Sequence, residues 1–234
     1  MTTPSGAKAR YRAENNANDH LGNFNGTAVG ANFSYAAGKY GQAFQLDGVD
    51  DTVTINDGDQ MWPAGSLTLE AWIKTTATKP SNVIISKYSC GDQCPAGITA
   101  YFALYTSATG HPGMDFRPDA PTQDITQIVA TTVTVNDGMW HHIVGVRDSV
   151  ANVGSVYVDG VLAVSANPDA AQFGPMTNVD GDVDLVTIGA SVVAGQTTYT
   201  SFFAGVIDDV AIYHSALTAA QVSAIYSAPE GKCL

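Results

Sequence analysis

Hydrophobic and polar residues alternate with a period of two along most of the chain. The segment Ser66–Lys74 shows this clearly, because every second residue from Leu67 to Ile73 is apolar and falls on one face of an extended strand. Comparable alternation predicts further strands at residues 52–55, 82–86, 101–105, 131–135, 140–147, 155–158, 161–164, 185–188 and 202–213. Many short strands separated by turns are typical of a β sandwich or jelly roll.

Two local motifs add detail to this pattern. Asp159-Gly160 stands between two β-branched runs and predicts a hairpin, because Asp and Gly tolerate the positive φ angles of a type I′ turn. Thr218-Ala-Ala-Gln221 is a capping box, in which two side chains satisfy backbone amides at the start of a helix. The sequence therefore predicts one short helix near the C-terminus, with an apolar stripe that docks on the sandwich: Leu217, Val222, Ile225 and Tyr226.

The chain is long enough for one large sandwich. Its 234 residues are 45% hydrophobic, which provides for a sizeable core. We therefore predict an all-β fold, a two-sheet antiparallel jelly-roll sandwich with one short C-terminal helix. We expect residues 11–227 to form this domain, residues 1–10 to be a flexible lead-in and residues 228–234 to be a linker stub.

Composition narrows the range of partners. The formal net charge is −12, from 22 acidic and 10 basic residues, which argues against binding to nucleic acid or to anionic lipid. No run of 18 apolar residues occurs, so we expect no membrane insertion. Of the 22 acids, 19 are Asp, a residue suited both to turns and to oxygen-coordinated cations.

The cysteines and the first residues bear on the compartment. Cys90 and Cys94 enclose three residues in a turn-rich segment, and a disulfide there is plausible in an oxidising compartment. A half zinc site or free thiols are the alternatives, and no second Cys pair completes a zinc site. Cys233 is the odd cysteine and suggests a partner in a longer protein. The start lacks the features of a signal peptide, so we interpret Met1 as a start codon added to a trimmed fragment. The cysteines favour an extracellular or cell-surface module over the alternative, a cytoplasmic protein.

Five local patterns occur in a fixed order along the chain. Each is weak alone, but five in this order and spacing are specific. They are Tyr11-Arg-Ala-Glu-Asn-Asn-Ala-Asn-Asp-His20 with Gly22-Asn-Phe-Asn-Gly26; Gly41-Gln-Ala-Phe-Gln-Leu-Asp-Gly-Val-Asp-Asp-Thr-Val53; Ser66-Leu-Thr-Leu-Glu-Ala-Trp-Ile73; Asp137-Gly-Met-Trp-His-His-Ile-Val-Gly-Val146 with Val156-Tyr-Val-Asp-Gly160; and Phe203-Ala-Gly-Val-Ile-Asp-Asp-Val-Ala-Ile-Tyr213 with Leu217-Thr-Ala-Ala-Gln-Val222.

Together these patterns resemble the laminin-G-like, concanavalin A-like jelly-roll modules of bacterial secreted proteins, which are related to pentraxins and legume-type lectins. The resemblance covers the chain from Tyr11 to about Cys233. It implies two antiparallel sheets stacked face to face, one of them concave. It also implies a non-catalytic binding module, of the kind appended to glycan-degrading enzymes or adhesins, and often a bound calcium ion.

The resemblance implies a calcium site near the N-terminus. The related modules bring the Asn-rich loop of residues 14–19 beside the strand that contains Asp208 and Asp209. We therefore assign a structural calcium ion to Glu14, Asn16, Asp19 and Asp208, with Asp209 as the alternative to Asp208. From the residues alone, an Asn-rich loop is equally well a loop without an ion.

Two other Asp clusters are interpreted as turns. Asp180-Gly-Asp-Val-Asp184 fails the EF-hand pattern, because Leu185 stands at position six and Ser191 at position twelve. Asp47, Asp50 and Asp51 lie between two predicted strands and are read as turn residues.

Catalysis has little support in the sequence. Jelly-roll glucanases need two nearby carboxylates, and their Glu-x-Asp-x-x-Glu strand motif is absent. Tyr101, Tyr105, His111 and Arg117 leave a slim route to polysaccharide lyase chemistry, but His111-Pro-Gly113 reads as a turn. We therefore expect no enzyme activity.

The leading interpretation is a carbohydrate-binding or adhesive module of a larger modular protein, with a glycan or polysaccharide as its partner. Trp62 and Tyr88 are the candidate aromatic platforms, and the candidate polar partners are His111, Asp115 and Arg117. Each also has an ordinary packing or pairing role as its alternative. The rival function is a purely structural or protein–protein interaction module.

Overall fold

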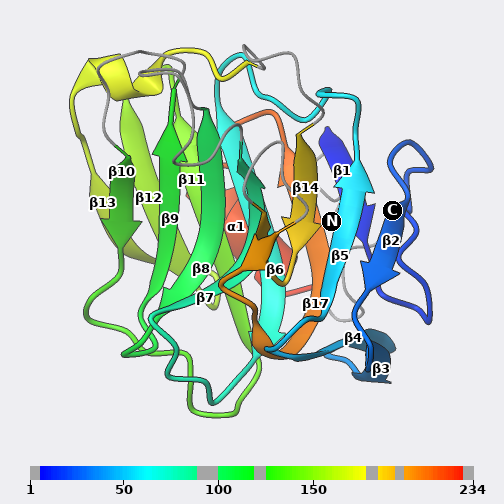
Figure 1. Cartoon of the computed structure of the whole chain (residues 1–234). Coiled ribbons are helices and arrows are strands. Elements are labelled where there is room, and N and C mark those ends of the chain that lie inside the picture. The colour runs from blue at the N-terminus through cyan, green and yellow to red at the C-terminus, as the bar shows by residue number, and fades with distance from the viewer. Residues whose placement is uncertain (1–5, 89–99, 119–124, 178–183, 193–197, 229–234) are drawn as a thin grey trace.

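Two antiparallel sheets stack face to face and enclose one core (Figure 1). The computed structural model describes residues 6–88, 100–118, 125–177, 184–192 and 198–228. The first sheet has the order β13 (Val161–Ala166), β12 (Val153–Val158), β11 (His141–Asp148), β6 (Leu67–Lys74), β17 (Ala204–Tyr213), β4 (Gln42–Asp47) and β3 (Ser34–Ala37), and β1 (Ala7–Tyr11) also pairs with β17.

The second sheet has seven strands. Its order is β10 (Thr126–Val129), β9 (Pro112–Arg117), β8 (Tyr101–Ser107), β7 (Ser81–Tyr88), β14 (Leu185–Ile188), β5 (Thr52–Asn56) and β2 (Gly26–Val29). A small ribbon of β15 (Ser191–Val192) and β16 (Tyr199–Thr200) is separate, and η1 (Ala170–Phe173) is a short 3₁₀ turn. The predicted all-β, two-sheet antiparallel sandwich is confirmed.

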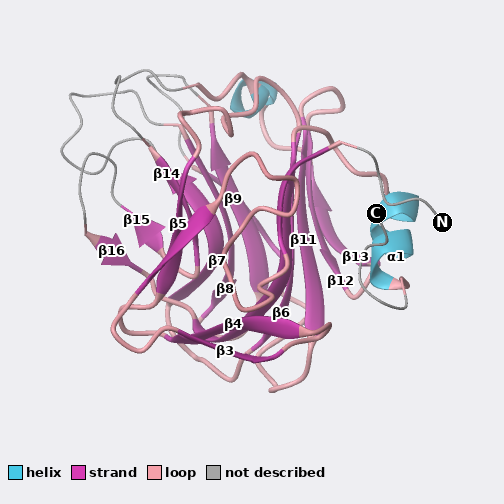
Figure 2. Cartoon of the chain, turned by 90° about the vertical axis from the view of Figure 1, so that its right-hand side faces the viewer, coloured by secondary structure: helices cyan, strands magenta, loops and turns pink. Residues whose placement is uncertain are grey.

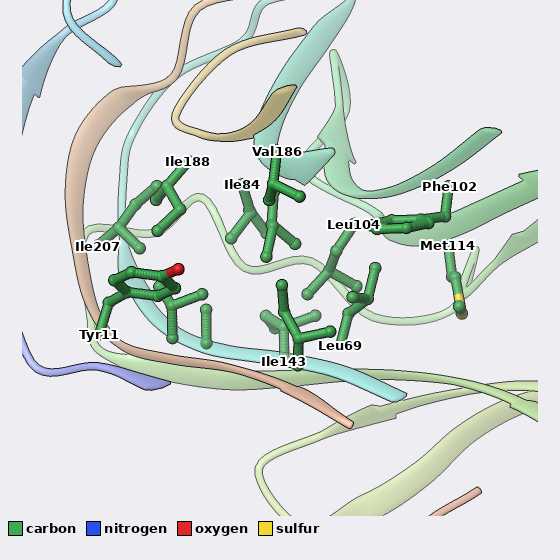
Figure 3. Packing of buried hydrophobic residues seen from close by; sticks show 14 of the residues in the cluster. Tyr11, Leu69, Ile84, Phe102, Leu104, Met114, Ile143, Val186, Ile188 and Ile207 are labelled. Carbon is green, nitrogen blue, oxygen red and sulfur yellow. The ribbon is translucent and has the colours of Figure 1, made fainter. Parts of the chain in front are cut away.

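Alternation along the strands builds the core, as the sequence pattern predicts. Leu69 of β6 and Ile143 of β11 face Leu104 of β8 and Val186 of β14 across the space between the sheets (Figure 3). All four side chains are fully buried. Burial of such apolar side chains contributes about 1.5–3 kcal/mol each to folding.

The predicted helix forms α1 (Ala219–Tyr226) and packs outside the first sheet (Figure 2). The capping box is present as predicted: Gln221 N donates to the Thr218 hydroxyl, and the Gln221 side chain accepts from Thr218 N. The helix buries Val222 and Ile225 in a second apolar cluster with Tyr213. No described helix has the length and apolar character needed to cross a bilayer.

Two boundaries differ from the sequence prediction. Residues 7–10, placed in the flexible lead-in, belong to β1, which pairs with β17 from Ala7 to Tyr11. The predicted strand at residues 131–135 is a loop, and the strand lies earlier, at β10. The apolar alternation of residues 131–135 has a different cause from strand pairing, because Val135 is buried although it lies in a loop. The Val135 amide donates to Gly110 O in the β8–β9 turn, not to a neighbouring strand.

The predicted hairpin between β12 and β13 is present. Asp159 and Gly160 have φ of 51° and 78°, the left-handed values that a type I′ turn requires.

Candidate functional site

The outer face of the second sheet, turned away from the first sheet, carries aromatic residues on β8. Phe102 and Leu104 of this strand lie in the core. Side chains alternate between the two faces of a strand, so Tyr101, Ala103 and Tyr105 point outward. The small Ala103 separates the two tyrosines along the strand.

The neighbouring strand β9 brings charged residues to the same face. Met114 and Phe116 lie in the core, and Gly113, Asp115 and Arg117 therefore point outward. A Cβ atom on Gly113 would lie 2.7 Å from Cζ of Tyr105, so this glycine lets the Tyr105 ring lie against the β9 backbone.

Strand register brings these residues together. Asp115 pairs with Ala103 of β8 on one side and with Gln127 of β10 on the other. Tyr88 of β7 pairs with Tyr101, and their rings meet edge to face at 5.2 Å. We call this set the outer-face cluster: Tyr88, Tyr101, Tyr105, Asp115, Arg117 and Gln127.

Asp115 is central in the outer-face cluster and only 7% exposed. The Gln127 side-chain amide donates to Asp115 Oδ2 at 3.1 Å. The Tyr105 hydroxyl also interacts with this carboxylate. No described residue makes a hydrogen bond of ordinary geometry to the other oxygen, Oδ1. Burial raises the pKa of Asp115 to about 6, and Gln127 and the nearby Tyr105 hydroxyl lower it in part.

The tyrosines of the cluster stay protonated at neutral pH. Burial raises the pKa of Tyr101 and of Tyr105, and the charge of Asp115 raises both further. Their hydroxyl groups can therefore donate hydrogen bonds. Arg117 is half-buried, and its Nε has no partner within the described part of the chain. The cluster thus offers aromatic surfaces, a carboxylate acceptor and several donors on one face.

Two of the residues proposed from sequence for ligand binding lie away from this cluster. Trp62 is 7% exposed and packs edge to face on Phe102 at 5.8 Å, inside the sandwich. It therefore cannot serve as the exposed platform that the sequence suggested. His111 lies in the β8–β9 turn, where its Nδ1 bonds to Val133 O at 2.7 Å. The other three proposed residues, Tyr88, Asp115 and Arg117, share the outer face.

The predicted calcium ligands divide into two groups. Glu14 and Asp208 both contact the turn that joins β3 and β4: Gln42 N donates to Glu14 Oε2 at 3.3 Å, and Tyr40 N donates to Asp208 Oδ2 at 2.9 Å. The turn glycines make room for these carboxylates, because a Cβ on Gly41 would lie 2.1 Å from Glu14 Oε1. Burial raises the pKa of Asp208 to about 7.

Asn16 and Asp19 have other hydrogen-bonding roles. Asn16 bonds within its own loop, to Glu14 O and Asn18 N. Both oxygens of the buried Asp19 accept backbone amides, and these come from Arg10, Leu21, Asn23 and Phe24. Asp19 therefore organises the loop through amide contacts, which are typical of a structural carboxylate.

Asp209, the alternative to Asp208, forms a buried ion pair with Arg10, with Oδ1 2.9 Å from Nε. The predicted disulfide between Cys90 and Cys94 lies outside the described residues, as does Cys233.

Residues 47–223 match a laminin G family model described as the Concanavalin A-like lectin/glucanases superfamily. The chain belongs to this superfamily. The resemblance inferred from the five ordered motifs is thus confirmed. The residues matched by the family model include Asp208 and the whole outer-face cluster. Glu14 lies before the matched region. No curated protein matches the chain.

Solved structures with a similar fold cover most of the chain. Domain 4 of the extracellular arabinanase AbnA from Geobacillus stearothermophilus, in complex with arabinotriose, is 21% identical with a TM-score of 0.67, over 94% of this chain and 97% of that one. The CBM40 of a Ruminococcus gnavus sialidase, bound to α2,6 sialyllactose, is 19% identical with a TM-score of 0.57, over 69% and 83%. A SAP-like pentraxin from Limulus polyphemus is 17% identical with a TM-score of 0.55, over 78% and 80%.

Sequence reasoning did not assign Gln127 to the site, and it considered Tyr101 and Tyr105 only for lyase chemistry. The alternation within residues 101–105 and 113–117 carries the needed signal, because it places the tyrosines and Asp115 on outward faces. The pairing of β9 with β10 carries no such signal, since residues 126–129 show no strand pattern distinct from their surroundings.

Proposed function

We propose that this protein is a non-catalytic carbohydrate-binding module, and that the outer-face cluster binds the glycan. The observation that carries the proposal is the buried Asp115 carboxylate beside two outward tyrosines, with an Oδ1 to which no described residue makes a hydrogen bond of ordinary geometry. Buried polar groups are nearly always hydrogen-bonded, so this oxygen suits a ligand hydroxyl group. Tyr88 and Tyr101 are partly exposed, so their rings can pack on the apolar face of a sugar ring, whereas Tyr105 is buried beneath this surface.

The same cluster argues against hydrolysis. Glycosidases of the common type use two carboxyl groups about 5–9.5 Å apart. Asp115 is the only carboxylate among the outward-facing described residues of β8, β9 and β10. A single acid can orient a sugar but cannot act as both acid and nucleophile. The lyase alternative also weakens, because His111 bonds to Val133 O in the turn.

We propose a neutral glycan as the ligand. Above pH 6 Asp115 carries a charge that only Arg117 offsets within the cluster, and the whole chain carries −12. An anionic polysaccharide would be repelled by that field. Arabinotriose, found with the arabinanase domain, is a neutral ligand, whereas sialyllactose, found with the sialidase module, is acidic. A secreted, modular parent protein fits such a role.

Calorimetric titration with arabino-oligosaccharides, gluco-oligosaccharides and sialyllactose tests this proposal. We expect a neutral oligosaccharide to bind, and Asp115→Ala and Tyr101→Ala to weaken its binding about tenfold or more. Asp169→Asn, which changes an exposed carboxylate beside η1, should bind as the parent does. Equal binding by Asp115→Ala would overturn the site, and preference for sialyllactose would overturn the neutral ligand.

A glycan panel without any binding would favour the rival function, a structural or protein–protein interaction module.

We further propose that Glu14 and Asp208 hold a structural calcium ion beside the β3–β4 turn. Two observations support this: both carboxylates approach one turn, and the pKa of Asp208 is raised by burial and by the neighbouring charge of Asp209. A cation would offset both effects. Asn16 and Asp19 stay outside the proposal because their side chains already bond within the loop.

The melting temperature with calcium and with a chelator tests the calcium site. We expect the chelator to lower it in the parent and to leave Asp208→Asn unchanged. A parent protein with the same melting temperature in both buffers would refute the structural ion.

A further inference from the structure

A second group of carboxylates lies at the turn between β4 and β5. One oxygen from each of Asp47, Asp50 and Asp51 lies within 4.8 Å of the others. Among the residues that the structure describes, no other three His, Cys, Asp or Glu side chains come so close. The sequence predicts that these three residues form a turn, and their hydrogen bonds show how far that role accounts for them.

Turn formation accounts for much of the group. Asp47 Oδ1 accepts from Val49 N at 2.7 Å and from Asp50 N at 3.3 Å. Asp51 Oδ2 accepts from Asp47 N at 3.0 Å. Asp50 Oδ2 accepts from Ala31 N at 3.4 Å, on the segment that joins β2 and β3. These bonds hold the turn but leave one buried oxygen of the three carboxylates without a donor.

That oxygen is Asp51 Oδ1. Asp51 is 1% exposed, and its Oδ1 has no hydrogen-bond partner in the described parts of the chain. The Gly30 backbone, with φ of 131°, covers it so closely that a Cβ there would lie 2.1 Å from Oδ1. A buried carboxylate oxygen without a hydrogen-bond partner lowers the stability of the folded state, so a partner is expected for Asp51 Oδ1.

Protein cations do not supply that partner. Lys79 is the basic residue at this turn, and its Nζ donates to Gly48 O rather than to a carboxylate. No described Lys, Arg or His forms an ion pair with any of the three acids. Burial raises the pKa of Asp51, the backbone amide of Asp47 lowers it in part, and the charges of Asp47 and Asp50 raise it.

We propose that Asp47, Asp50 and Asp51 bind a divalent cation, with calcium as the fitting ion. Calcium takes six to eight oxygen ligands and accepts carboxylates, backbone carbonyls and water in flexible geometry. Such an ion would engage the buried Asp51 Oδ1 and neutralise the repulsion among the three acids. It would also fasten the segment Gly30–Ala31 to the β4–β5 turn.

This site is separate from the calcium site proposed at Glu14 and Asp208, and independent of glycan binding. Asp148 provides a matched control for Asp47. Its Oδ1 accepts from Val150 N at 2.9 Å and Ala151 N at 3.0 Å, the same turn pattern without neighbouring acids. Asn at either position keeps the turn-forming oxygen and removes the charge.

Calorimetric titration of the chelator-treated full chain with CaCl₂ tests the proposal. We expect a site with a Kd on the order of 10⁻⁴–10⁻³ M, as in extracellular modules. Asp47→Asn and Asp50→Asn should each weaken that site about tenfold or more, whereas Asp148→Asn and Asp208→Asn should leave it in place.

Each outcome decides between the possibilities. Loss of a binding event in Asp50→Asn but not in Asp208→Asn supports the site. No binding by the parent up to about 10 mM calcium, a range well above extracellular sites, overturns it. Binding that only Asp208→Asn removes also overturns it. Asp50 is exposed and bonds only weakly, so its variant should fold, and circular dichroism checks this.

Discussion

Lys87 and Asp57 form an ion pair inside the sandwich, with Nζ 2.8 Å from Oδ1 and no exposed surface on either side chain. Lys87 lies on β7 opposite the core residue Phe102, so its side chain runs inward from the second sheet. Its Nζ also donates to Asp184 O at 2.6 Å and lies 4.9 Å from the centre of the Trp62 ring. The ammonium group is thereby compensated on several sides.

Removal of this ammonium group should be severely destabilising. Lys87→Met leaves the Asp57 charge buried without compensation, and we expect the free energy of unfolding to fall by about 3–5 kcal/mol. Urea denaturation measures this. Lys74→Met, which changes an exposed lysine on β6, should cost less than about 1 kcal/mol. Similar losses of unfolding free energy in both variants would show that the buried ion pair does not contribute to stability more than an exposed lysine does.

Asp115 should make stability depend on pH. Its pKa is 3.8 in an ordinary setting and about 6 in the folded chain, so the folded state binds more protons between these values. Stability therefore falls as pH rises from about 4 to about 6, by about 2–3 kcal/mol. Asp115→Asn should lack this step. Urea unfolding at several pH values compares the two, and parallel curves for parent and variant would contradict the shift.

Gly113→Ala should displace the Tyr105 ring of the outer-face cluster. The new Cβ would lie 2.7 Å from Cζ of Tyr105, so the ring must move off the β9 backbone. We expect a loss of about 1–3 kcal/mol in unfolding free energy, together with weaker glycan binding. Gly174→Ala is the control, because its Cβ would have its nearest neighbour at 3.5 Å. A Gly113→Ala protein equal to the parent in both measurements would disprove this contact.

Thr218→Ala should weaken the attachment of α1. It removes the hydroxyl that accepts from Gln221 N at 3.3 Å, and caps of this kind contribute about 0.5–2 kcal/mol. Thermal unfolding followed by circular dichroism should show the loss. Ser223→Ala, at an exposed position within the helix, should have no such effect. Equal stability of both variants would argue that packing of Val222 and Ile225 alone holds the helix.

The alternation of apolar and polar residues predicted most strands correctly, because each strand buries one of its two faces in the core. The exception at residues 131–135 has the same cause: Val135 is buried, so a loop that packs inward imitates a strand. The capping box predicted α1 because its two contacts are local in sequence. Long-range contacts decided the rest of the fold, including the pairing of β1 with β17.

The candidate site was harder to predict, because exposure depends on distant residues. Trp62 precedes a proline and looked like a loop platform, yet Phe102 and the inward Lys87 enclose it. Asp19 sits in an Asn-rich loop that resembles a ligand loop, but its oxygens accept backbone amides instead. Asp115 and Arg117 were predicted only as polar side chains that could bond a sugar, and their shared face comes from strand β9, which the sequence analysis did not predict.

The two ends of the described chain meet on one side of the sandwich. β1 starts at Ala7 beside Tyr213, and Tyr40 Oη donates to Ala228 O at 3.0 Å, just after α1 (Figure 2). Both ends thus belong to the first sheet and its helix, whereas the outer-face cluster lies on the opposite layer. Any segment joined at either end would leave from the layer opposite the outer-face cluster, so the proposed glycan site would face away from that segment.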